Sequence, residues 1–169
     1  MPDHAATPAF TSKTLTAALA FFLGSLGAHR FYLYGVRDVF GWLHLLATVA
    51  GVIGVERLMG SHLQSGTGWL CAAAGYVSVL AALLAAIVYG LRPDAKWDAR
   101  FNAAHAGNAT DPVDPVDPVD PAGQRSDSGW TVVLIVMAAL FVGASILMGG
   151  LAIGIQTYFE AQLGQRGLN

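Results

Sequence analysis

Charged side chains are scarce in this chain of 169 residues. Asp, Glu, Lys and Arg make up 12% of it, whereas soluble domains carry roughly 25%. The chain has 9 basic and 11 acidic residues, and 11 of these 20 lie between Arg92 and Asp127. The rest of the chain cannot cover a water-facing surface with so few charges. This excludes a soluble enzyme, a nucleic-acid-binding protein and a disordered protein.

The residue patterns of catalytic and metal sites are also missing. Cys71 is the only cysteine, so an internal disulfide or a CxxC zinc or redox site cannot form. None of the five histidines belongs to an HExxH pattern or to an i, i+4 pair. No Gly-rich phosphate loop and no GxSxG are present. We therefore expect no catalytic residue, no metal, no cofactor and no enzymatic activity, and the net charge of -2 predicts no nucleic-acid partner.

Four long apolar runs predict an all-α integral membrane protein with four transmembrane helices. A span needs about 20 mostly apolar residues, and the third and fourth runs exceed this length. The first two are short and reach it by recruiting flanking residues, with Lys13 snorkelling to the interface. Two alternatives, buried core helices and a signal peptide, lack a polar outer face and an A-x-A site, respectively. The expected spans are residues 13–29, 36–56, 67–91 and 130–158.

Residues 92–129 form the expected extramembrane loop between the third and fourth spans. Residues 111–121 read DPVDPVDPVDP, and this repeat favours an extended polyproline-type spacer. The part before the repeat is either a short interfacial helix or a loop. Four spans would put the N-terminal tail, residues 1–12, and the C-terminal tail, residues 159–169, on one side. The other side then holds six of the nine Lys and Arg residues, which favours tails outside the cytoplasm. The expected location is a bacterial inner membrane.

Small residues indicate where the spans pack, because helices in lipid associate through close backbone approach. The third span has an unbroken stripe of small residues at every fourth position. The fourth span contains a GxxxG pair, and the first contains Gly24. These seams join spans of one chain or two copies of a homo-oligomer. The predicted packing residues are Gly24, Ala74, Ser78, Ala82, Ala86, Gly90, Gly150 and Gly154.

The most specific motif closes the first span and opens the second. Residues 24–35 read GSLGAHRFYLYG, which resembles the connection in the TM2 domain family. Lys13 before the first span and an acidic residue at the end of the second, here Glu56, extend the resemblance over residues 13–58. Tyr34 stands where the family usually has Gly. The resemblance implies a pair of transmembrane helices joined by a short loop. It also implies a family whose members mostly have no assigned biochemical activity.

Two functions from different classes are consistent with these features. The first is a membrane-embedded interaction or scaffold module. Its loop residues His29, Arg30, Phe31 and Tyr32 would bind a membrane protein partner, a second copy or a lipid headgroup of the bilayer. The alternative is a small oligomeric transporter or channel, whose path would use the few polar residues within the spans. Those residues are His44, Thr48, Ser78 and Gln156.

Overall fold

The computed structural model describes residues 9–105, 126 and 128–166. Helices are the only regular elements among them, which confirms the predicted all-α class. The DPV repeat lies outside the described residues. The elements in chain order are α1 (Lys13–Leu23), the 3₁₀ turn η1 (Gly24–Leu26), α2 (Ala28–Tyr34), α3 (Val39–Gly60), α4 (Gly66–Gly90), α5 (Asp94–Phe101) and α6 (Trp130–Arg166).

Three helices, α3, α4 and α6, are long and apolar enough to cross a membrane. The expected spans at 36–56, 67–91 and 130–158 correspond to them. The expected first span does not form as a full-length helix. The apolar segment Lys13–Leu26 covers about 20 Å at 1.5 Å per residue, less than the roughly 30 Å of the hydrocarbon core. The described residues therefore contain three candidate spans and one helix of partial length.

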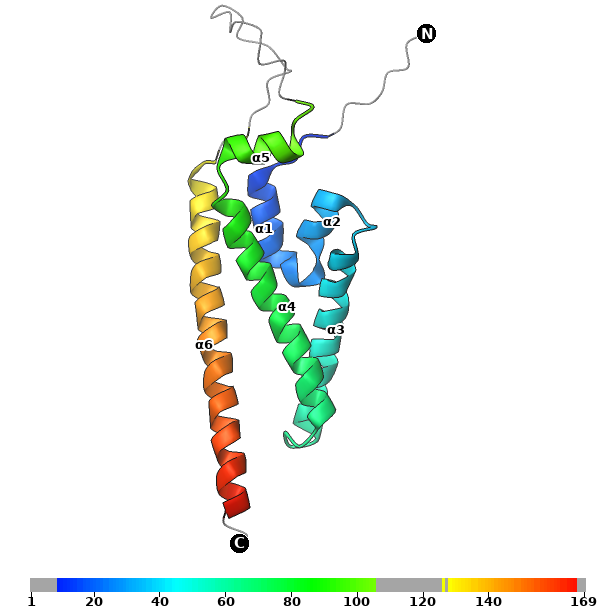
Figure 1. The fold of residues 1–169 in the computed structure, drawn as a ribbon, viewed down its shortest axis with the longest axis vertical. Coiled ribbons are helices and arrows are strands. Elements are labelled where there is room, and N and C mark those ends of the chain that lie inside the picture. Colours follow the sequence, from blue (N-terminus) through cyan, green and yellow to red (C-terminus); the bar gives the residue numbers. More distant parts are fainter. Residues whose placement is uncertain (1–8, 106–125, 127, 167–169) are drawn as a thin grey trace, which may run out of the picture.

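The first segment is short because the chain reverses direction after η1. Gly27 has a φ of 79°, a left-handed conformation that glycine adopts without steric cost. A Cβ atom there would lie 2.3 Å from the carbonyl oxygen of Gly41. After this turn α2 runs back alongside α1 (Figure 1). We call α1, η1 and α2 together, residues 13–34, the re-entrant hairpin.

The tip of the re-entrant hairpin lies at the middle of the long helices. A Cβ atom on Gly24 would be 2.7 Å from that of Ala82, and the Ser25 carbonyl accepts a hydrogen bond from Ser78 Oγ. Ser78 is the central residue of α4. The motif that the sequence analysis placed in a surface loop between two spans therefore begins at the middle of the bundle.

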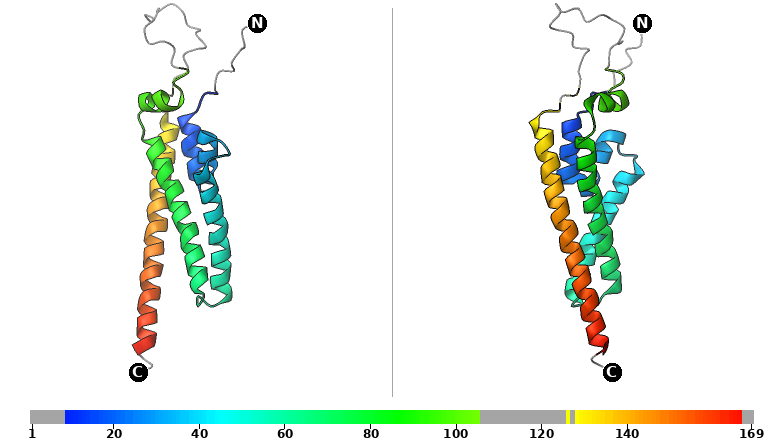
Figure 2. Two further views of the ribbon diagram at one scale, coloured as in Figure 1. Left: turned by 45° about the vertical axis from the view of Figure 1, so that its right-hand side comes forward. Right: turned by 60° about the vertical axis from the view of Figure 1, so that its left-hand side comes forward.

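The two ends of the described chain lie at opposite ends of the molecule. α1 begins beside α5, and α6 ends at the far end of the bundle (Figures 1 and 2). The four spans predicted from the sequence would have put both tails on one side. With three, the start of α1 and the end of α6 fall on different sides of a membrane.

Small residues bring α4 against each of its neighbours. Gly75 of α4 meets Gly51 of α3, where an added Cβ would lie 2.6 Å from the opposite Cα. Gly90 faces Val136 of α6 in the same close manner. Ala20, Leu83, Ala86 and Ala139 form the buried cluster between α1, α4 and α6. Most large apolar side chains point outward instead, as expected where the surrounding solvent is lipid.

Candidate functional site

The irregular backbone at the hairpin tip is stabilised by side chains from α3 and α4. The Ser25 carbonyl accepts hydrogen bonds from Thr48 Oγ1 at 2.6 Å and Ser78 Oγ at 3.3 Å. Non-helical backbone at membrane depth requires such buried partners, because lipid offers none. His44 Nδ1 is 2.9 Å from Ser78 Oγ. Three of the four polar residues predicted for a transport path therefore gather at this turn, whereas Gln156 lies elsewhere and pairs with Glu160.

His29 lies inside the bundle rather than on an accessible loop. Only 1% of it is exposed. Its ring packs edge-on against His44 with centroids 5.5 Å apart, and against Tyr89 at 6.0 Å. Its Nδ1 atom has no hydrogen-bond partner among the described residues. This placement makes His29 a packing residue of the re-entrant hairpin and leaves it no surface for a docking partner.

Arg30 is held by a carboxylate that the sequence analysis did not identify. Its Nε and Nη2 atoms donate to the two carboxylate oxygens of Asp38, each at 2.9 Å. Its guanidinium also stacks on the rings of Tyr34, at 4.7 Å, and Phe40, at 4.9 Å. Asp38 caps α3 by accepting from Gly41 N, and its position before a helical apolar run is an N-cap signal. The hydrogen bonds from Arg30 lower the pKa of Asp38.

Two of the three aromatic residues of the motif, Phe31 and Tyr32, fix the hairpin to its surroundings. The ring of Phe31 lies against Gly41, whose added Cβ would be 2.4 Å from Phe31 Cε1, and contacts Trp42 edge-on at 5.5 Å. The Tyr32 hydroxyl accepts a hydrogen bond from Ser12 N at 3.1 Å. Of the four predicted loop residues, Arg30 and Phe31 are partly covered, Tyr32 is exposed and His29 is buried.

A second polar cluster joins the start of α1 to α5. Lys13 is 4% exposed and pairs with Asp94, so it does not snorkel to a headgroup as the sequence analysis expected. Asn102 bonds both the N–H and the carbonyl of Thr11, and Trp97 Nε1 donates to the same carbonyl at 2.9 Å. We call Thr11, Lys13, Asp94, Trp97 and Asn102 the clasp. Its pairs are more than 75 residues apart in sequence, and no local pattern predicts them.

The clasp carboxylate is kept charged by its hydrogen bonds. Burial raises the pKa of Asp94, but hydrogen bonds from Lys13 and from the side chain and backbone of Ser128 outweigh it, and the net shift is downward. Ser128 precedes α6. Asp94 therefore ties the start of α1, the start of α5 and the approach to α6 together.

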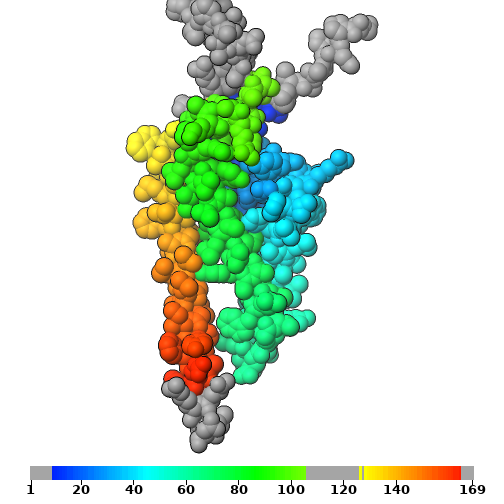
Figure 3. All heavy atoms as spheres, in the orientation of Figure 1, coloured from blue at the N-terminus to red at the C-terminus, as the bar shows by residue number. Residues whose placement is uncertain are grey.

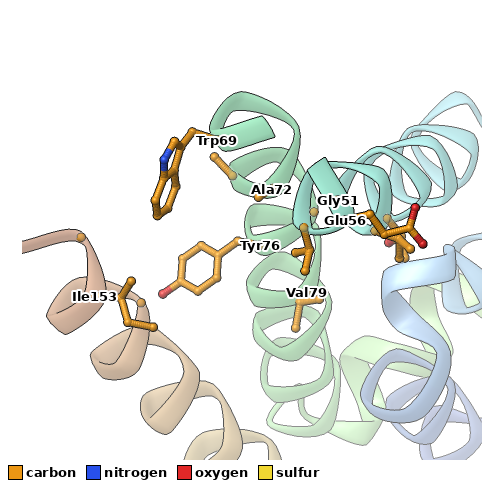
Figure 4. Close-up of a pocket in the computed structure, with 14 residues that line it drawn as sticks. Gly51, Glu56, Trp69, Ala72, Tyr76, Val79 and Ile153 are labelled. Carbon is orange, nitrogen blue, oxygen red and sulfur yellow. The ribbon is translucent and has the colours of Figure 1, made fainter. Parts of the chain in front are cut away.

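An apolar groove separates α6 from the α3–α4 hairpin in the half of the molecule far from α5 (Figure 3). Its volume is about 680 Å³. Tyr76 points from α4 toward Ile153 of α6, whereas the Glu56 carboxylate points away from α6 (Figure 4). The Tyr76 hydroxyl lies 3.0 Å from the Ile146 carbonyl and bridges the two helices. The groove is lined mainly by Gly, Ala, Val and aromatic side chains.

The predicted packing residues divide into two groups. Gly24, Ser78, Ala82, Ala86 and Gly90 are buried between helices. Gly150 meets the Tyr76 ring. By contrast, Ala74 is exposed, and Gly154 has open space where a side chain would be. On α4 the neighbouring Gly75 makes the close contact to α3. The face of α4 that contacts α3 is therefore rotated by about one residue from the predicted stripe.

The described part of the chain contains no group of three His, Cys, Asp or Glu residues that could hold a metal ion.

The long apolar helices and the apolar outer surface define an integral, multi-pass membrane protein. The family model of the TM2 domain matches residues 10–55. This segment, which covers the re-entrant hairpin and most of α3, is a TM2 domain, as its motif indicated. No curated protein and no solved structure matches the chain.

Proposed function

We propose that the protein is a membrane-embedded interaction module and that the exposed surface around Arg30 binds a partner in the membrane. Five exposed side chains from the end of α2 to the first turn of α3 form this surface. We call them the loop surface: Tyr34, Val36, Val39, Phe40 and Trp42. The proposal includes no catalytic step.

The observation that carries the proposal is the rigidity of this apolar, aromatic surface. Arg30 joins its two sides through Asp38 and stacks on both Tyr34 and Phe40. Trp42 Nε1 donates to the Val36 carbonyl at 2.8 Å, which fixes the intervening turn. Aromatic and Arg side chains dominate binding energy at interfaces, and a surface ordered before binding loses little entropy when a partner docks.

The polar residues on which the transport alternative depended support it less well. Thr48 and Ser78 bond the Ser25 carbonyl, so the need to satisfy the hairpin tip accounts for them. Substrate flux into liposomes that contain the pure protein, lost on His44→Ala, would contradict the interaction proposal. A bacterial inner membrane remains the proposed location.

Photocrosslinking from within the membrane tests the proposal. A photoreactive phenylalanine analogue is placed at Phe40, with Phe141 of α6 as the matched control, since both rings are more than half exposed. We expect a discrete protein adduct at position 40 and only diffuse lipid adducts at 141. Arg30→Ala should cut the adduct at 40 at least severalfold while membrane insertion is unchanged. Equal adducts at both positions, or none at 40, would refute the proposal.

A further inference from the structure

Basic side chains without an ion-pair partner collect at the α5 end of the bundle. α5 lies across this end (Figures 1 and 2), with Trp97 fully buried against the bundle and Lys96 and Arg100 exposed. The only ion pairs among the described residues are Lys13–Asp94 and Arg30–Asp38. The remaining cations at this end have no carboxylate partner within the part of the chain that the structure describes. We call them the basic rim: Arg37, Arg92, Lys96 and Arg100.

A stacked row of side chains connects the α2 and α5 parts of this end. The Arg30 guanidinium lies 4.7 Å from the Tyr34 ring centroid. Tyr34 meets Phe101 edge-on with centroids 6.2 Å apart, and the Arg100 guanidinium lies 5.5 Å from the Phe101 centroid. The row places Arg100 near the α2–α3 turn that carries Arg37. Its two aromatic rings occupy the interfacial layer that such side chains favour.

The positions of the rim residues along the chain place them at headgroup level. Arg92 follows the end of α4 by two residues, and Arg37 precedes the start of α3 by two. Basic side chains at the ends of spans extend toward the phosphate layer. Clusters of Lys and Arg in this position attract anionic lipids.

Among the described residues, the charge balance at the α5 end is positive. Lys13 and Arg30 are neutralised by Asp94 and Asp38. The remaining acidic group on α5, Asp98, accepts hydrogen bonds from Ser126 and Asn102. The opposite end has two basic and two acidic residues among those described, Arg57, Arg166, Glu56 and Glu160. In the described parts of the two ends, the α5 end is the one with excess positive charge, which is complementary to a negatively charged surface.

We propose that the basic rim binds the phosphate headgroups of anionic phospholipids in the adjacent leaflet. The lipid is recognised by charge at Arg37, Arg92, Lys96 and Arg100, and its glycerol region lies beside the Tyr34–Phe101 pair. The lipid site shares Tyr34 with the loop surface, but its four cations lie outside the set of residues proposed to bind the protein partner.

Native mass spectrometry of the full chain in detergent, with phosphatidylglycerol and phosphatidylcholine in equal amounts, tests the proposal. Wild type should retain more phosphatidylglycerol. Each rim cation near the surface contributes about a fivefold preference, so Lys96→Gln and Arg100→Gln together should remove most of it. The charge-conserving pair Lys96→Arg and Arg100→Lys should keep it. Arg57→Gln, at the other end, is the matched control and should leave the preference unchanged.

Three outcomes would overturn the proposal. Wild type retaining both lipids equally would show that the rim does not select charge. Arg57→Gln causing the same loss as the rim variant would show that the effect is not specific to the α5 end. Displacement of phosphatidylglycerol by excess inorganic phosphate would assign the site to a free anion instead of a lipid. All rim variants change exposed or half-exposed side chains, and unchanged circular dichroism verifies that they fold.

Discussion

At Gly27 the chain turns back toward its starting side, and two physical constraints act on this one residue. Its φ of 79° disfavours any residue with a Cβ atom. The Gly41 carbonyl occupies the space where that atom would lie. Gly35 has nearly the same φ, 78°, but open space around it. The ψ of Gly35 is 173°, in a region that residues other than glycine avoid, whereas Gly27 has a ψ of 9° in the left-handed helical region. An added Cβ atom therefore meets backbone strain alone at Gly35 and a steric clash as well at Gly27.

We predict that Gly27→Ala destabilises the protein far more than Gly35→Ala. The substitution at Gly35 should cost about 1–3 kcal/mol, the usual cost of a strained backbone conformation. At Gly27 the clash with Gly41 adds to that cost, because backbone atoms of a packed helix cannot give way. Thermal unfolding of the detergent-solubilised variants measures the difference. Equal midpoints would show that the turn does not depend on the contact with Gly41.

Part of the candidate site could be predicted from individual residues of the sequence. Arg30 belongs to a contiguous motif and was identified from it. Asp38 was missed, although its N-cap position was readable, because the seven residues between it and Arg30 give no sign that the two side chains meet. His29 was expected on an accessible loop, since a histidine beside an arginine indicates a polar interface. It is buried because the turn before it lies inside the bundle.

Among the elements, the clasp determines where α5 and the start of α1 lie. Lys13 has 5% of its side chain exposed and Asp94 has 32%. The group that remains therefore differs in its environment when either partner of this ion pair is removed. Without Asp94, a buried ammonium group would keep only the Arg92 carbonyl as a partner. Without the Lys13 charge, Asp94 would still reach water and Ser128.

We predict that Asp94→Asn costs more stability than Lys13→Met. An uncompensated buried charge costs about 3 kcal/mol or more. After Lys13→Met the group left without its partner is Asp94, which is partly exposed to water and still accepts a hydrogen bond from Ser128. The free energy of unfolding of each variant, with Ser126→Ala as a control at the neighbouring Asp98, measures this. A larger loss for Lys13→Met would contradict the asymmetry.

The same clasp gives a pH dependence whose sign follows from Asp94. Its pKa is lowered in the folded protein, so the ionised form stabilises the fold. This stabilisation is fully present above the ordinary carboxyl pKa of about 4 and is lost as the pH falls through the lower, folded value. Wild type should lose stability in this acidic range, and Asp94→Asn should lose less there.

Charge-free runs predicted α3, α4 and α6 but not the re-entrant hairpin. A run of apolar residues looks the same whether the helix crosses the bilayer or stops halfway. The difference lies in Thr48 and Ser78, which satisfy the backbone at the tip and come from other helices. Small residues predicted close packing on α4, but the seam to α3 uses Gly75 and not Ala74, because helix rotation is set by all neighbours together.

For the whole molecule, three spans change the expected topology of the N-terminal side. The α5 end has six Lys and Arg residues among those described, and the opposite end has Arg57 and Arg166. From the positive-inside tendency we expect the α5 end to face the cytoplasm. The start of α1 is then cytoplasmic, whereas four spans would put it outside.

Single cysteines in a Cys71→Ser background test this arrangement in intact cells with a membrane-impermeant maleimide. We expect labelling of His62→Cys, in the α3–α4 turn, and protection of Ala99→Cys in α5. These two are also expected for four spans. Ala9→Cys distinguishes the arrangements, because it should be protected with three spans and labelled with four. All three positions are exposed.

The re-entrant hairpin also gives the protein different cross-sectional areas in the two leaflets of the bilayer. In the half nearer α5, the hairpin packs beside α3, α4 and α6, whereas only the three long helices continue into the other half (Figure 2). The protein therefore occupies more area in one leaflet than in the other. Lipids around such a wedge must spread in the wider leaflet or bend with it. Several copies in one region would favour a membrane that is convex on the α5 side.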